Sequence, residues 1–172
     1  MGKARRVPMA ELRAMLIGLG YTDVATLLNS GNAVFKAHGG VSAKHAADIA
    51  AALVHSLEFE VPVIVKSQAE LAAIVAENPL AVASQGLSRL LVAFVPDAKT
   101  LSGLEAIEGL VVAPERFALG KRAAYLHCPA GIPGSKAGEA LLGKAGQRVT
   151  TRNWATVLKL HAMARGAAAT SR

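Results

Sequence analysis

The residues best suited to binding an anion gather near the starts of the last two predicted helices. Lys136 follows Gly131-Ile132-Pro133-Gly134-Ser135, and Arg152 and Asn153 open a segment that reaches Lys159. The start of a helix carries a partial positive charge, so cations placed there favour a bound phosphate or carboxylate. The full P-loop pattern Gly-x4-Gly-Lys-Ser/Thr is absent. Lys136, Arg152, Asn153 and Lys159 are the predicted anion-binding residues, and a solvated basic surface is the alternative.

Helical geometry links three residues of the final segment. At about 100° per residue, Arg152, Thr156 and Lys159 lie within about 60° of arc on one side of a helix. Trp154 falls on the apolar side. It is therefore predicted to anchor the core rather than to stack on a ligand.

Ser30 and Asn32 form a second candidate group, in the turn Asn29-Ser30-Gly31-Asn32. The flanking apolar runs predict a tight β-hairpin in which Gly31 tolerates a positive φ. An activated serine is not indicated, because the sequence has no Gly-x-Ser-x-Gly elbow at this position. Hairpin geometry is the preferred interpretation. If the protein is an enzyme, Ser30 and Asn32 would line the ligand cleft.

Metal and cysteine chemistry are not indicated. No two histidines have the i, i+4 spacing that places two imidazoles on one metal. The histidines are His38, His45, His55, His127 and His161. The single cysteine, Cys128, excludes an intramolecular disulfide and is predicted to be a small core residue. We therefore expect no metal and no cofactor.

Composition and charge define the class of protein. The chain has 172 residues, of which 52% are hydrophobic, and this excludes intrinsic disorder. No apolar stretch is long enough to span a membrane, so no membrane association and a cytoplasmic location are expected.

The net charge is +3 over residues 1–36, −5 over residues 37–115 and +9 over residues 116–172. This asymmetry indicates an anionic partner for the last third, with a basic surface that only confers solubility as the alternative.

Periodicity and turn signals predict alternating helices and strands. Helices are expected at 8–19, 42–56, after Ser67 in a capping box to about 78, after 96–97, at 135–144 and after residue 150 or 151. Strands are expected at 24–28, 33–37, 61–66, 90–95, 110–113, 123–127 and 148–150, with a linker at 81–88.

This order predicts an α+β fold of two ferredoxin-like (split βαβ) halves, the first without its leading strand, plus a C-terminal helix. The predicted organisation is a truncated N-terminal half at 1–66, a helical connector and linker at 67–88, a C-terminal half at 89–150, and a helix and tail at 151–172. The missing strand would leave an unpaired sheet edge in the first half. A second copy of the chain could pair with that edge to form a homo-oligomer.

Two segments resemble a known family. They are Leu28-Asn29-Ser30-Gly31-Asn32-Ala33-Val34-Phe35 and Arg152-Asn153-Trp154-Ala155-Thr156-Val157-Leu158-Lys159, supported by Val7-Pro8-Met9-Ala10-Glu11-Leu12-Arg13 and Ser135-Lys136. The chain is similar to the bacterial domain-of-unknown-function 1697 family. The resemblance implies two related ferredoxin-like halves and no established activity. The first strand and the Arg-Gly-Ile-Asn-type loop that precede Val7 in the family are absent from this sequence.

Two functional classes follow. The preferred one is a binding module for an anion, either a nucleic acid bound without sequence specificity on a ferredoxin-like sheet or a phosphorylated small molecule. An aromatic content of 4% argues against base stacking. The alternative is an enzyme of unknown reaction that acts on a phosphorylated or carboxylated small molecule. For that role the basic third offers a single acidic residue, Glu139, which is expected to be solvated.

Overall fold

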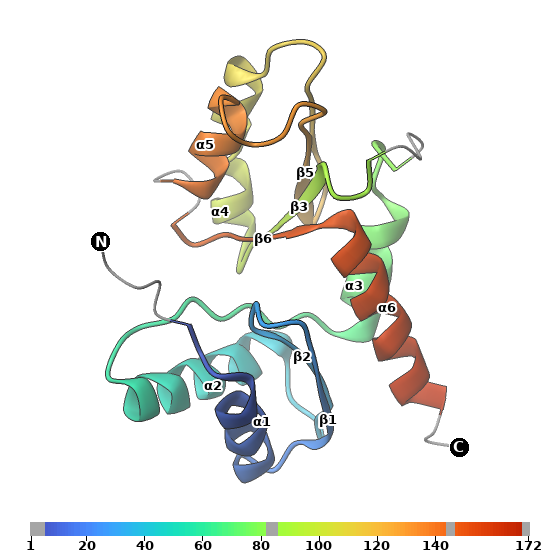
Figure 1. The fold of residues 1–172 in the computed structure, drawn as a ribbon. Coiled ribbons are helices and arrows are strands. Elements are labelled where there is room, and N and C mark those ends of the chain that lie inside the picture. Colours follow the sequence, from blue (N-terminus) through green and yellow to red (C-terminus); the bar gives the residue numbers. More distant parts are fainter. Residues whose placement is uncertain (1–5, 82–85, 144–146, 170–172) are drawn as a thin grey trace. The chain divides into compact units, whose positions relative to one another are not determined.

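The chain forms two compact units with one antiparallel sheet each (Figure 1). The structure, a computed structural model, describes residues 6–81, 86–143 and 147–169. Unit 1 comprises Met1–Val65 and Leu160–Arg172, and unit 2 comprises Lys66–Lys159. The predicted linker at 81–88 and the end of the predicted helix at 135–144 lie partly outside the described residues.

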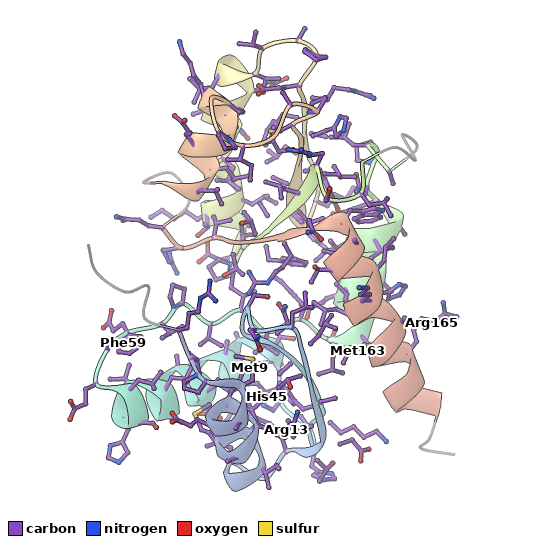
Figure 2. The ribbon with its side chains drawn as sticks, viewed as in Figure 1. Met9, Arg13, His45, Phe59, Met163 and Arg165 are labelled. Atoms are coloured by element: carbon purple, nitrogen blue, oxygen red, sulfur yellow. The ribbon has the colours of Figure 1, made fainter. Side chains whose placement is uncertain are left out.

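Unit 1 contains α1 (Met9–Gly18), β1 (Thr22–Leu27), β2 (Asn32–Lys36) and α2 (Ser42–Leu57). Its core joins one face of each helix to the hairpin through Leu12, Leu16, Tyr21, Ile49 and Leu53, with Met9 packed against them (Figure 2). The Tyr21 ring lies 4.3 Å from the Phe35 ring, and its hydroxyl is 2.9 Å from Nδ1 of His45. The predicted helix at 8–19 and the predicted hairpin are both present, and their apolar side chains are buried together in this core.

The strand predicted at 61–66 is not formed. The sheet of unit 1, within the described residues, consists of β1 and β2. Val61, Val63 and Val65 nevertheless pack against the core of unit 1. In the predicted strand order this segment pairs only with a leading strand. No described residue before α1 forms such a strand, and the backbone of 61–66 therefore has no ladder partner.

Unit 2 is built around a four-stranded antiparallel sheet with the strand order β4-β5-β3-β6. Its elements are α3 (Gln68–Ala76), β3 (Leu90–Phe94), α4 (Ala98–Ser102), the 3-10 helix η1 (Glu105–Leu110), β4 (Arg116–Leu119), β5 (Ala123–His127), α5 (Lys136–Leu142) and β6 (Thr150–Asn153). The helix α6 (Trp154–Ala169) follows, and its residues after Lys159 belong to unit 1.

Two predicted boundaries in unit 2 were wrong. The strand expected at 110–113 begins instead at Arg116, because η1 extends to Leu110 and Pro114 has no N–H to donate to a ladder. The final helix begins at Trp154, since the preceding strand continues to Asn153, opposite Leu91 of β3.

Both faces of the unit 2 sheet are buried. On one face Ala93 and Val95 belong to a core that includes residues of α4, η1 and α5. On the other face Val92 and Tyr125 are fully buried, and the Tyr125 hydroxyl donates to the carbonyl oxygen of Ile74 in α3 at 2.6 Å. The central strands β3 and β5 of this sheet are therefore covered on both faces.

Candidate functional site

Lys136 is the first residue of α5 and is exposed. Side chains of the same segment accept hydrogen bonds from main-chain N–H groups at the start of this seven-residue helix. The Ser135 hydroxyl accepts from the N–H of Gly138 at 2.9 Å, and the Glu139 carboxylate accepts from the N–H of Gly134 at 3.4 Å. These acceptors are the chain's own, so the binding role of Lys136 stays a prediction.

Arg152 lies in a strand rather than in the final helix. It stands opposite Val92 in β6, and its Nη1 donates to the carbonyl oxygen of Thr151 at 2.7 Å. Burial lowers the pKa of its guanidinium group. The predicted helical stripe shared by Arg152, Thr156 and Lys159 is therefore wrong, because helical spacing does not apply across the end of a strand.

Asn153 and Lys159 have different surroundings. The Asn153 Oδ1 accepts from the N–H of Thr156 at 2.9 Å, so this residue caps the start of α6. Lys159 is exposed on the same helix, and Trp154 is buried, as predicted. Nothing in this geometry assigns a ligand to Asn153 or Lys159.

Ser30 and Asn32 stabilise the hairpin of unit 1. The Asn32 amide donates to the Ser30 hydroxyl at 2.9 Å and to the carbonyl oxygen of Leu27 at 3.2 Å. Asn32 is buried, and Gly31 has a φ of +80°. The interpretation as hairpin geometry is confirmed. These two residues belong to unit 1, whereas Lys136, Arg152, Asn153 and Lys159 belong to unit 2.

Cys128 is a core residue, as predicted. It is buried in the core of unit 2, with its sulfur 3.6 Å from the Ser135 hydroxyl, and burial raises the pKa of its thiol. Across the described ranges, no three His, Cys, Asp or Glu side chains are placed to hold one metal ion. None of the helices in those ranges is long and apolar enough to cross a membrane.

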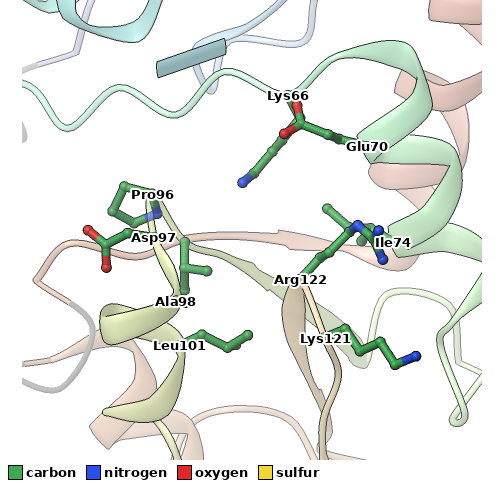
Figure 3. A pocket seen from close by; sticks show the side chains of 10 residues that line it. Lys66, Glu70, Ile74, Pro96, Asp97, Ala98, Leu101, Lys121 and Arg122 are labelled. Atoms are coloured by element: carbon green, nitrogen blue, oxygen red, sulfur yellow. The ribbon is translucent and has the colours of Figure 1, made fainter. Parts of the chain in front are cut away.

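A cavity of about 170 Å³ opens at the end of the unit 2 sheet, where β3 ends and the chain turns from β4 to β5 (Figure 3). We name it the Lys66–Arg122 pocket. It is lined by Lys66, Glu70, Ile74, Val95, Pro96, Asp97, Ala98, Leu101, Lys121 and Arg122. Lys66 extends into it from the start of α3, Arg122 rises from the β4–β5 turn on another wall, and Lys121 extends away from Lys66.

The two acidic residues of this pocket accept hydrogen bonds from their own chain. Asp97 caps α4 by accepting from the N–H and the hydroxyl of Thr100, each at 2.7 Å, and Arg148 donates to it at 3.2 Å. The hydrogen bonds from Thr100 are the main cause of a lowered pKa for this carboxyl group. Glu70 accepts from the N–H of Ser67 at 2.7 Å in the predicted capping box, which is confirmed. Both carboxylates are therefore engaged.

The cations of the pocket are less engaged. Among residues 6–81, 86–143 and 147–169, the ammonium groups of Lys66 and Lys121 have no ion-pair or hydrogen-bond partner. The Arg122 guanidinium lies 3.6 Å from the Glu77 carboxylate, too far for a tight ion pair, and about half of its side chain is exposed. The pocket therefore presents positive charge that an anion can use.

Sequence reasoning missed these cations. Lys66 lies in residues 37–115, whose net charge is −5, so a net charge calculated over the whole segment did not indicate a cationic site there. Lys66 and Arg122 come together only because α3 packs beside the β4–β5 turn. A local signal was present in Gly120-Lys121-Arg122, where two cations occupy a tight turn between strands.

Comparison with known proteins identifies the family and supports the fold. The profile of a family described as "Protein of unknown function (DUF1697)" matches residues 1–125, a range that includes the hairpin motif and excludes 152–159. No curated protein matches the chain. A solved structure, the conserved bacterial protein SP0830 from Streptococcus pneumoniae, is similar with a TM-score of 0.78 and 23% identity, over 96% of this chain and 92% of that one. This chain belongs to the DUF1697 family of proteins of unknown function.

Proposed function

We propose that this protein is a binding module for a small phosphorylated or carboxylated molecule, held in the Lys66–Arg122 pocket. The observation that carries this proposal is the ammonium group of Lys66, which has no partner among the residues that the structure describes and extends into a cavity that Arg122 also lines. Lys66 supplies a mobile point charge, and Arg122 supplies a planar set of donors. Lys121 adds positive potential at the rim.

A small molecule suits this site better than a nucleic acid does. The cavity has a volume of about 170 Å³, enough for one compact anionic group. The buried faces of the unit 2 sheet cannot stack bases, and the pocket lies at the end of that sheet. A nucleic acid bound through the basic last third stays the alternative that the test below separates.

Binding is also favoured over catalysis. A general base must have lone pairs directed at the substrate. In this pocket Glu70 and Asp97 already accept hydrogen bonds from Ser67 and Thr100, and Asp97 also pairs with Arg148. The carboxylates therefore shape the wall of the pocket, and the cations select the ligand.

We also infer that unit 2 is the ferredoxin-like half of the chain. Its element order β3, α4, β4, β5, α5, β6 and its strand order β4-β5-β3-β6 support this inference. In such a half both helices pack on one face, in line with a core that contains Leu101 of α4 and Leu141 of α5. The second face is available for an additional element, and here α3 occupies it at Ile74.

Isothermal titration calorimetry with inorganic phosphate tests the proposed function. We expect saturable binding by the native protein, weakened about tenfold in Lys66→Ala and in Arg122→Ala, the loss expected for one hydrogen bond to a charged group. Lys159→Ala and Lys136→Ala remove exposed cations outside the pocket and should bind as the native protein does.

Three outcomes would overturn the proposal. One is the absence of phosphate binding by the native protein. Another is equal weakening in Lys66→Ala and Lys159→Ala, which would indicate general basicity. The third is weakening confined to Lys136→Ala, which would favour the site predicted at the start of α5. A fluorescent single-stranded oligonucleotide that binds with steep salt dependence while phosphate does not would favour the nucleic-acid alternative.

A further inference from the structure

We infer, on the basis of the proposed function, that Glu77 is a positioning residue that sets the affinity of the pocket by competing with the ligand for Arg122. Glu77 follows the last residue of α3 and does not line the cavity. Its side chain is 19% exposed, against 49% for Arg122. It therefore acts on the ligand from behind Arg122 rather than by contact.

The two carboxylate oxygens of Glu77 have separate tasks. Oε1 accepts from the main-chain N–H of Arg122 at 3.0 Å, and it lies 3.4 Å from the Tyr125 hydroxyl, which donates its proton to the Ile74 carbonyl oxygen at 2.6 Å. Oε2 faces the Arg122 guanidinium, with 3.6 Å between Oε2 and Nη1. One oxygen thus fixes the β4–β5 turn to the end of α3. The other holds the guanidinium group electrostatically without a hydrogen bond.

The close approach at this turn requires Gly120. A Cβ atom at this position would lie 2.9 Å from Oε1 of Glu77 and 2.9 Å from the Ala123 carbonyl oxygen. The main-chain anchor made by Oε1 is therefore short and fixed. The contact at Oε2 is long, so the guanidinium of Arg122 can leave Glu77 for a ligand without loss of the anchor.

This arrangement predicts how the pocket discriminates between anions. A ligand gains Arg122 only by drawing it from a carboxylate that is itself a formal charge of −1. Anions of higher charge compete better with Glu77 than monoanions do. Glu77 therefore lowers the affinity for every anion that must draw Arg122 away from it.

Glu77→Gln separates the two tasks. The amide oxygen of glutamine can keep the hydrogen bond from the main-chain N–H of Arg122, because a flipped amide would point its NH2 group at that donor. The NH2 group then faces the Arg122 guanidinium and removes the attraction. Glu77→Ala removes both tasks and leaves the N–H of Arg122 without its acceptor.

The experiment measures phosphate affinity by calorimetry, together with the melting temperature, for the native protein, Glu77→Gln, Glu77→Ala, Arg122→Ala and the double variant Glu77→Gln/Arg122→Ala. We expect Glu77→Gln to bind phosphate about threefold more tightly, the scale of a part-exposed charge pair, at an unchanged melting temperature. Glu77→Ala should melt at a lower temperature. In the Arg122→Ala background Glu77→Gln should have no effect on affinity.

Each contrary outcome has a distinct meaning. Phosphate binding that Glu77→Gln leaves unchanged or weakens overturns the role of Glu77 and leaves the proposed function standing. A gain in affinity that persists in the Arg122→Ala background overturns the action through Arg122, because Glu77 would then repel the ligand directly. A native protein that binds no phosphate removes the proposed function and this role with it.

Discussion

The hairpins β1–β2 and β4–β5 use the side chains of their turns in opposite ways. In unit 1 the polar side chains of the turn bond to each other, since Asn32 donates to Ser30 and to the main chain. In unit 2 the turn between β4 and β5 carries Lys121, which has no ion pair among the described residues, and Arg122, which has a long pair of 3.6 Å with Glu77. The β1–β2 turn, which the sequence motif identifies, therefore stabilises the fold, and the β4–β5 turn, which no motif marks, lines the pocket.

The largest effect on the turn of unit 2 is expected from a substitution at Gly120. Its Cβ would lie 2.9 Å from the Ala123 carbonyl oxygen and from the Tyr125 ring, so Gly120→Ala forces the turn of unit 2 apart. We expect a loss of about 2 kcal/mol in the free energy of unfolding, as overpacking of a tight site causes. Phosphate binding should weaken as well, because Lys121 and Arg122 move. Urea denaturation and calorimetry measure the two effects.

Gly109→Ala is the matched control in the same unit, since a Cβ at this position meets no atom within 4 Å. Equal stability of Gly120→Ala and Gly109→Ala would contradict the close packing described for the turn.

The hairpin of unit 1 supplies the next largest effect. Asn32→Ala removes the donor to Ser30 and to the Leu27 carbonyl oxygen, and we expect a loss of about 1–2 kcal/mol in unfolding free energy. Phosphate affinity should stay the same, because these residues belong to unit 1 and the pocket belongs to unit 2. A fall in phosphate affinity would return Asn32 to the ligand site that the sequence suggested.

A smaller effect is expected from Tyr125→Phe, which leaves the Ile74 carbonyl oxygen without its donor and should cost about 1 kcal/mol. Burial, with a contribution from Glu77, raises the pKa of the Tyr125 hydroxyl above its usual value of 10.0. The folded state therefore keeps this proton when the unfolded state has lost it. The stabilising effect is complete below pH 10.0 and is lost as the pH rises above that value.

Denaturation of the native protein and of Tyr125→Phe at neutral and at high pH tests this linkage. The native protein should lose more stability at high pH than the variant does. Parallel losses in the two proteins would show that Tyr125 does not hold α3 through an un-ionised hydroxyl.

Local patterns predicted the elements that local physics determines. The capping box at Ser67 and the hairpin turn at Gly31 depend on neighbours within a few residues, and both are present. Trp154 is buried as well, as its large apolar side chain predicted. The strand expected at 61–66 failed for a non-local reason, because a strand exists only with a ladder partner. The prediction of a helical stripe through Arg152 is wrong because strand β6 continues to Asn153, three residues beyond its predicted end at 150.

The pocket could not be predicted by the same reasoning. Its cations come from the residue before the N-cap of α3 and from a turn that follows β4, and neither segment contains a known ligand-binding motif. Their meeting depends on how α3 packs against one face of the sheet, which the Tyr125 hydroxyl fixes at Ile74. The net charge indicated an excess of positive charge in the last third of the chain. Tertiary packing determines which of those positive side chains line a cavity.

The burial of Cys128 has a practical consequence for labelling. Thiol reagents attack the thiolate, and this thiol is both enclosed by the core of unit 2 and held protonated by its raised pKa. Because Cys128 is the only cysteine of the chain, we expect the native protein to react slowly with such reagents until unit 2 opens. A fluorophore can therefore be attached selectively to a second cysteine introduced at the surface. The rate at which Cys128 itself is modified then measures how often unit 2 opens.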